Sequence, residues 1–214
     1  MKLIVVRHGE STMNVSDLVQ GNLNISGLTE TGKRQAMELG QRLASKPITV
    51  AYVSPLRRAQ QTAEIVLSHH PKTKIVLADQ LIERSFGKYQ GRSKSIFYAD
   101  FNASGLLYPR FKPENGENWY EAGERVSSFI QSEIIAKHRT TNDAILIVGH
   151  GSVLTHFLML MDNQPVELAD QKAQYDKYRP ANAALSVVEI EADGQHRVTL
   201  LNDISHLSEL PAKV

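Results

Sequence analysis

Cysteine is absent from this 214-residue chain. Its absence excludes disulfide bonds, catalysis by a thiolate and metal sites built on cysteine ligands. An excess of one charge is lacking as well, because 24 Lys and Arg stand against 23 Asp and Glu, a formal net charge of +1. A nearly neutral chain gives no support for general binding to nucleic acid or to a membrane surface. We expect neither partner.

Long hydrophobic runs are also missing. No stretch approaches the roughly 18 apolar residues that a membrane-spanning helix needs. The apolar run before Arg7 has four residues, which is too short for a signal peptide. We therefore expect a soluble, cytoplasmic protein. The chain contains no internal repeat, low-complexity tract or linker, so residues 1–214 are expected to form a single domain. The oligomeric state has no signal in the sequence.

Short apolar segments alternate with segments of helical periodicity. Strands are expected at 2–6, 48–53, 73–77, 144–148, 185–190 and 197–202. Helices are expected from Thr29 toward Pro47, from Ser54 (as its cap) to Leu67, from Glu117 to His138, and after His150 to Met161. This alternation predicts an α/β three-layer sandwich with a mostly parallel central sheet and helices on both faces. Asp193-Gly194 between the last two strands predicts a hairpin that adds an antiparallel edge strand.

The first strand ends in an unusual group of residues, VVRHGES at 5–11. Arg7 offers a planar fork of donors that suits phosphate or carboxylate. His8 can act as a nucleophile, base or metal ligand near neutral pH. Gly9 would let a ligand approach the main chain closely. The group is typical of a site that binds an oxyanion.

A second His-Gly pair, His150-Gly151, follows the strand at 144–148. Arg58 and Thr62 share one helical face just beyond a third strand. Because ligands of parallel α/β sheets bind outside the carboxyl ends of the strands, we expect these three strand ends to meet at one site.

Other chemistries fit the pattern less well. A metal site is disfavoured because HExxH is absent and because Arg7 beside His8 would repel a divalent cation. GHGSV at 149–153 is not the G-x-S-x-G of a serine hydrolase, and a P-loop is missing. The remaining histidines show no ligand spacing and are expected to be structural or exposed: His69, His70, His138, His156, His196 and His206. We expect no metal and no other cofactor.

An ordered set of motifs covers nearly the whole chain. It comprises RHGES with Asn14, QG at 20–21, LTETGKRQA at 28–36, SPLRRAQQTA at 54–63, LIERSFGKYQG at 81–91, NGENWYEAGERV at 115–126 and VGHGSVL at 148–154. This set resembles the phosphoglycerate-mutase-like branch of the histidine phosphatase superfamily, and among its members the broad-specificity phosphatases.

The resemblance implies a role for each matching residue. His8 is the expected nucleophile, which becomes a phosphohistidine, and Glu83 is the expected general acid. Arg7, Arg58 and His150 are expected to hold the phosphoryl oxygens. The expected substrate contacts are Asn14, Gln20, Gly21, Gly151 and Ser152.

The physical requirements of phosphoryl transfer agree with these roles. Charge spreads over the oxygens of the transferring group, so catalysis is mostly positioning and electrostatic stabilisation. Two arginine forks and an imidazolium at His150 could supply the stabilisation without a metal. The nucleophilic His8 must be neutral, and an alkoxide leaving group needs a proton from Glu83.

Three functions remain in view. The leading hypothesis is a metal-independent phosphomonoester hydrolase that acts on a small phosphorylated metabolite. The rival enzyme is a cofactor-dependent phosphoglycerate mutase, which uses the same five residues but carries a longer insert between the acid and the second His. The third is a catalytically silent phosphate-binding scaffold, which the presence of all five residues disfavours.

Segment 92–113 is predicted to be a lid-like insert that selects the substrate. It holds Phe97, Tyr98, Phe101, Tyr108 and Phe111, five of the 14 aromatic residues of the chain. Its cations are Arg92, Lys94, Arg110 and Lys112, against Asp100 alone, a local net charge of 4 − 1 = +3. Such a lid would select a substrate whose leaving part is anionic and partly apolar. The alternative is a small helical cap whose aromatics fill its own core and whose charges are solvated; both can hold together.

Overall fold

A computed structural model describes residues 1–208 and 210 of the chain. Its strands are β1 (Lys2–Arg7), β2 (Ile48–Val53), β3 (Lys74–Leu77), β4 (Ala144–Gly149), β5 (Leu185–Ile190) and β6 (His196–Asp203). Its helices are α1 (Glu30–Leu43), α2 (Arg57–Val66), α3 (Lys94–Ala103), α4 (Trp119–Phe129), α5 (Ala136–His138), α6 (Gly151–Met161) and α7 (Lys172–Tyr178). A π-helical segment, Ile130–Ile135, joins α4 to α5.

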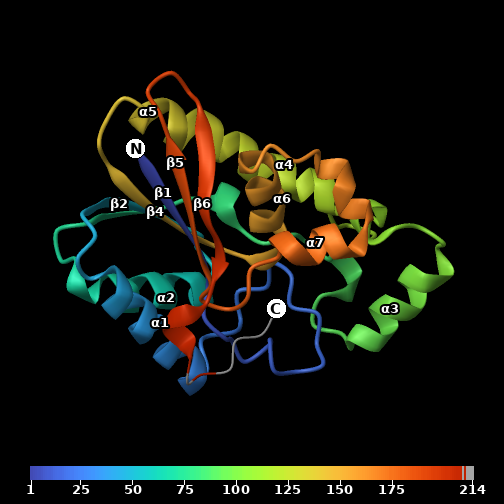
Figure 1. Cartoon of the computed structure of the whole chain (residues 1–214). Helices are drawn as coiled ribbons and strands as arrows, with labels where there is room; N and C mark the ends of the chain where they lie inside the picture. Colours follow the sequence, from blue (N-terminus) through green and yellow to red (C-terminus); the bar gives the residue numbers. More distant parts are fainter. Residues whose placement is uncertain (209, 211–214) are drawn as a thin grey trace.

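The strands form one sheet in the order β3-β2-β4-β1-β5-β6 (Figure 1). The first four in this order pair in parallel, whereas β5 runs antiparallel to β1 and β6 antiparallel to β5. Helices α1 and α2 cover one face of the sheet, and α4, α6 and α7 cover the other (Figure 1). The predicted three-layer sandwich with a mostly parallel sheet and an antiparallel edge is confirmed.

Two apolar cores lie on the two faces of the sheet. Strand β1 alternates between them, since Leu3 and Val5 belong to the core under α4 and α6 while Ile4 and Val6 belong to the core under α1 and α2. All six residues of β4 are buried. These two central strands therefore hold the residues that follow them in a rigid, dry setting.

The local predictions hold at α1 and fail at α2. Thr29 caps α1 as predicted, because its side chain accepts a hydrogen bond from the backbone N–H of Gly32. Ser54 was predicted to cap the next helix, but α2 begins at Arg57 with Leu56 as its cap residue. The Ser54 hydroxyl instead lies 2.8 Å from Nε2 of His150, a tertiary contact that helix periodicity cannot reveal.

Segment 92–113 forms α3 and a short turn at the periphery of the molecule (Figure 1). Tyr89, Phe97 and Phe111 are buried in a small core of their own, with Phe101 and Tyr108 packed against it. The alternative of a helical cap that fills its own core thus describes part of this segment. Among the described residues, no helix is both long and apolar enough to cross a membrane.

Candidate active site

The carboxyl ends of β1 and β4 meet, as the topology predicts. The register pairs Arg7 with Gly149, and the backbone N–H of His8 donates to the carbonyl of Gly149 at 3.0 Å. The two His-Gly motifs are therefore side by side, with the rings of His8 and His150 5.1 Å apart between centroids.

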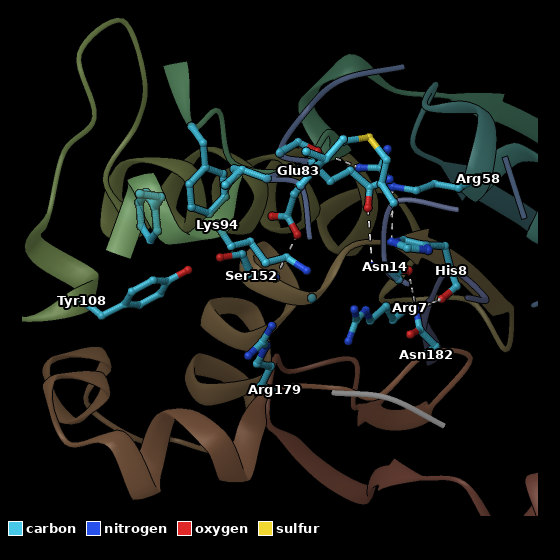
Figure 2. A pocket seen from close by; sticks show the side chains of 18 of the residues that line it. Arg7, His8, Asn14, Arg58, Glu83, Lys94, Tyr108, Ser152, Arg179 and Asn182 are labelled. Carbon is cyan, nitrogen blue, oxygen red and sulfur yellow. Dashed lines mark hydrogen bonds between the residues drawn. The ribbon is translucent and has the colours of Figure 1, made fainter. Parts of the chain in front are cut away.

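A cavity of about 230 Å³ opens at this edge of the sheet (Figure 2). Of the predicted residues, it is lined by Arg7, His8, Asn14, Gln20, Gly21, Arg58, Glu83, Lys94, Gly151 and Ser152. His150 does not line the cavity. It is fully buried beside His8.

Two hydrogen bonds fix the tautomer of His8. Its Nδ1 donates to the carbonyl of Gly9 at 2.7 Å, so the lone pair resides on Nε2. The Nε of Arg58 donates to that Nε2 at 3.3 Å. Burial, followed by the charges of Arg58 and Arg7, lowers the pKa of His8 well below its usual value. The ring is therefore neutral at pH 7, with its nucleophilic atom facing a cation.

The two arginines are buried and tied to backbone carbonyls. Arg58 donates from its terminal nitrogens to Leu23 and Gly21, both at 2.9 Å, and Arg7 donates to Pro180 at 2.7 Å. Burial lowers the pKa of each to about 10. Both guanidinium groups remain charged at neutral pH. They are preorganised cations, because little movement is left to them when an anion arrives.

The surroundings of His150 oppose the imidazolium that was expected there. Burial, then the charges of Arg58 and its other neighbours, lowers the pKa of His150 well below its usual value. Its Nε2 contacts the Ser54 hydroxyl, and its buried Nδ1 has no hydrogen-bond partner among the described residues. The sequence predicts that His150 lies near Arg7 and Arg58. Only the structure shows that all three side chains are buried together, away from solvent.

Glu83 reaches the cavity from the turn after β3. One carboxylate oxygen accepts from the backbone N–H of Arg84 at 2.8 Å, and the other accepts from that of Ser152 at 3.1 Å (Figure 2). Ser152 belongs to the first turn of α6, whose exposed N–H groups favour a negative charge. Ser152 thus holds the candidate acid through its backbone.

Three glycines act through packing. Gly9 was expected to admit a ligand, but a Cβ there would lie 2.5 Å from the carbonyl oxygen of Gly32, so its role is to let α1 approach β1. Gly21 has a φ of +52° and presents its carbonyl to Arg58. A Cβ at Gly151 would lie 3.4 Å from Arg7, whose side chain passes over it.

Thr62, which was expected near the site, lies beside the residue that follows His8. Its hydroxyl accepts a hydrogen bond from the backbone N–H of Gly9.

Asn14 and Gln20 belong to a polar network beside His8. Oδ1 of Asn14 accepts from the backbone N–H of Ser11 at 3.0 Å and from Nδ2 of Asn182 at 3.2 Å. The same Nδ2 donates to the carbonyl of His8 at 3.1 Å. Gln20 contacts Asn14 and Ser26. This network braces the backbone that carries His8.

Only one of the four cations predicted for the lid reaches the cavity. Lys94 lines it, with its Nζ donating to the carbonyl of Ser16 at 2.7 Å. Arg110 pairs with Asp170 and Lys112 with Glu121, each at 2.6 Å, and Arg92 is exposed outside the cavity. Two of the four cations of this segment are therefore paired with carboxylates that lie outside it.

Sequence reasoning missed several lining residues, namely Tyr175, Arg179 and Asn182 from α7 and the loop after it. A signal for them was present. Because β5 is antiparallel to β1, the residues just before β5 must lie at the carboxyl end of β1. The backbone N–H of Ala183 indeed donates to the carbonyls of Arg7 and His8.

Comparison with known proteins identifies a family that matches nearly the whole chain. A sequence profile of the histidine phosphatase superfamily (branch 1) matches residues 3–204. Fructose-2,6-bisphosphatase TIGAR B of Danio rerio is 35% identical over 177 residues, which cover 80% of this chain and 65% of that protein, just under two thirds of its length. A phosphoglycerate mutase of Schizosaccharomyces pombe is 32% identical over 165 residues, which cover 73% of this chain and 77% of the mutase.

The solved structures agree. The structure of Bacillus stearothermophilus YhfR superposes with a TM-score of 0.83 at 29% identity, covering 96% of this chain and 98% of that one. The predicted resemblance is thus confirmed in sequence and in fold. The chain belongs to the histidine phosphatase superfamily, branch 1.

Proposed function

We propose that this protein is a phosphomonoester hydrolase that acts without a metal ion, through a phosphohistidine intermediate, on a small phosphorylated metabolite. One observation carries the proposal: a neutral His8 presents the lone pair of Nε2 to the cavity edge, with Arg58 3.3 Å from that atom. A nucleophile and a fixed cation meet where a phosphoryl group would be transferred. Family membership and a relative named as a bisphosphatase support the same reaction.

In the first half-reaction, Nε2 of His8 attacks phosphorus and the bond from phosphorus to the ester oxygen breaks. Arg7 and Arg58 stabilise the negative charge on the transferring oxygens. Glu83, as the general acid, donates a proton to the leaving oxygen. The dianionic group would also offset the cationic field around His150, so that this ring can donate to it. Each of these roles rests on the position of the residue in the cavity or beside it.

In the second half-reaction, water attacks the phosphohistidine. The Glu83 carboxylate accepts a proton from that water, phosphorus forms a bond to its oxygen, and the bond to Nε2 breaks. Inorganic phosphate leaves, and His8 returns to its neutral form. Because Ser152 holds Glu83 through a backbone N–H at 3.1 Å, the carboxylate stays on one side of the cavity in both steps.

Some of the other predicted residues are proposed to contact the substrate directly, and others to hold the catalytic side chains in place. We assign Asn14, Gln20 and Gly151 to the walls that contact phosphate or substrate. Gly21 and Ser152 act through the groups they hold, Arg58 and Glu83. Residues 1–214 are proposed to form one domain in which 92–113 is a lid-like insert, because its Lys94 and Phe97 line the cavity together with Tyr108. We place the enzyme in the cytoplasm, where small phosphorylated metabolites are retained by their charge.

A mutase is the second candidate function, and the similarity to the Schizosaccharomyces pombe mutase favours it. A mutase transfers the phosphoryl group from the histidine back to a bound phosphoglycerate, whereas a hydrolase transfers it to water. A phosphate-binding scaffold would form no covalent adduct at all.

Trapping the intermediate tests the proposal. The protein is mixed rapidly with a ³²P-labelled phosphomonoester and quenched in alkali, in which phosphohistidine survives. Wild-type protein and a His69→Ala control, whose ring is exposed, should carry the label, and His8→Ala should not. Phosphate release should continue in EDTA. Label on His8→Ala would contradict the assignment, and interconversion of 2- and 3-phosphoglycerate that outpaces phosphate release would favour the mutase.

A further inference from the structure

Arg179 is a cation in the cavity that the transfer chemistry does not use. It follows α7 directly and lines the cavity, with its side chain projecting between Arg7 and Tyr108 (Figure 2). Among the described residues, none accepts a hydrogen bond from its guanidinium group or forms an ion pair with it. By contrast, Arg58 and Lys94 are tied to backbone carbonyls. Arg179 therefore retains its full set of donors for a ligand.

The neighbours of Arg179 place it between the phosphoryl clamp and the aromatic wall of the cavity. Its pKa is lowered by burial and raised by the nearby Tyr175, Tyr108 and Glu83, with a net rise. The charge of Arg179 also helps to lower the pKa of Arg7, so the two guanidinium groups lie near each other. Arg179 thus borders Arg7 of the phosphoryl clamp on one side and the general acid and the tyrosines on the other.

The neighbouring wall is suited to an organic group. The rings of Tyr108 and Tyr175 pack at 5.6 Å, and Phe97 and Tyr98 line the same cavity. A phosphomonoester whose phosphorus lies at His8 would extend its leaving part past Glu83 along these rings. An anion at the far end of that part would meet Arg179.

We propose that Arg179 binds a second anionic group, so that the preferred substrates are phosphomonoesters whose leaving part carries a carboxylate or another phosphate. This inference rests on the proposed function for the position of the phosphoryl group. It assigns the recognition of this anion to Arg179, which lies outside segment 92–113, and not to the cations of that segment. A guanidinium fork recognises either anion through paired, charge-assisted hydrogen bonds.

Binding of phosphonates tests the proposal without requiring turnover. Three probes share a phosphonate and a three-carbon chain and differ in the group at the far end. 3-Hydroxypropylphosphonate carries an uncharged hydroxyl there and is the reference, 3-phosphonopropionate carries a carboxylate, and 1,3-propylenediphosphonate carries a second phosphonate. Dissociation constants are measured by calorimetry for the wild type and for Arg179→Gln, Arg179→Lys and Arg92→Gln. The last variant removes the same charge from an exposed site outside the cavity.

Wild-type protein should bind at least one of the probes with a second anionic group about 10- to 100-fold more tightly than the hydroxyl reference, the effect of one or two charge-assisted hydrogen bonds. Arg179→Gln should lose that preference, Arg179→Lys should keep part of it, and Arg92→Gln should keep all of it. The probe that shows the preference identifies the anion as carboxylate or phosphate.

Two results would overturn the inference. An equal loss of affinity for all three probes in Arg179→Gln would place Arg179 in the phosphoryl clamp, and no preference in the wild type would remove the second subsite. Failure of the proposed function is distinguishable from both. In that case His8 would acquire no label from a phosphomonoester, whatever the affinities for phosphonates.

Discussion

The Nε of Arg58 donates a hydrogen bond to Nε2 of His8 at 3.3 Å. This contact joins the end of β1 to the first turn of α2. Together with the bond from Nδ1 to the carbonyl of Gly9 it fixes the tautomer of the candidate nucleophile, and after burial the charge of Arg58 is the next cause of its lowered pKa. The same guanidinium is held by Leu23 and Gly21. Removal of Arg58 therefore affects both the nucleophile and the phosphoryl clamp.

Arg58→Ala should lower kcat/KM for a phosphomonoester about 10²–10³-fold, the usual loss for one preorganised group that stabilises an oxyanion. Arg58→Lys should recover little, because a lysine cannot reach two carbonyls and Nε2 from one planar fork. Steady-state kinetics of both variants check this. A rate near that of the wild type in Arg58→Ala would remove Arg58 from the clamp.

Glu83→Gln should cost about 10²–10⁴-fold in kcat on an alkyl phosphate, since the leaving alkoxide then departs without its proton. The loss in the first half-reaction should be much smaller for p-nitrophenyl phosphate, whose leaving group hardly needs protonation. Burst-phase release of p-nitrophenol separates that step from hydrolysis of the intermediate. Equal losses on the two substrates would indicate that Glu83 only shapes the cavity.

The ring of His8 should not take up a proton near pH 6.5. Its pKa is well below the usual value because of burial and the charges of Arg58 and Arg7. In an NMR titration of the free enzyme, the imidazole signal that disappears in His8→Gln should therefore stay constant between pH 6 and 8. A midpoint near pH 6.5 would show that the ring is solvated and that the site is open.

His156 should make the free energy of unfolding decrease as the pH falls. Burial lowers its pKa to about 4 in the folded protein, against 6.5 for an ordinary histidine. Between these values the unfolded chain binds a proton that the folded chain does not, so the stabilisation is complete above pH 6.5 and is lost as the pH falls toward 4. From pH 7 to 5 this histidine should account for about 2 kcal/mol of lost unfolding free energy.

Denaturant unfolding at both pH values tests this. His156→Leu should lose about 2 kcal/mol less than the wild type over that interval, and His69→Leu, at an exposed position, should behave like the wild type. An unchanged pH dependence in His156→Leu would show that its ring is already protonated or solvated in the folded state.

Gly32→Ala should destabilise the protein by about 1–3 kcal/mol or more. A Cβ on Gly32 would collide with the backbone carbonyl of Glu10, two residues after His8, and backbone cannot move aside as a side chain can. Turnover should fall with it, because α1 would be pushed away from the end of β1. Gly27→Ala is the control, since its nearest neighbour is the flexible end of Gln61.

The elements that the sequence predicted well are those whose own pattern decides them. Strands such as 144–148 are continuous apolar runs, and α1 begins at a cap residue and ends before a proline. The carboxyl ends of β1 and β4 then bring Arg7, His8 and His150 to one edge of a parallel sheet. For these residues, the direction of the strands is enough to predict that they meet.

The lid cations show where such reasoning fails. Arg110 and Lys112 look like free charge in sequence, but Asp170 and Glu121 neutralise them across the surface. Ser54 looks like a helix cap, yet its hydroxyl contacts His150 from another strand. The partners of Arg110 and of Ser54 lie 60 and 96 residues away, and such pairs leave no periodic trace in the chain.

By itself, the sequence determined the α/β architecture, the family and the main reactive residues, because strand composition and motif order are local properties. The tertiary structure alone decided the protonation of His8 and His150 and the free guanidinium of Arg179. Desolvation and electrostatic interaction depend on how closely groups approach in space. That approach is set by packing between segments far apart along the chain.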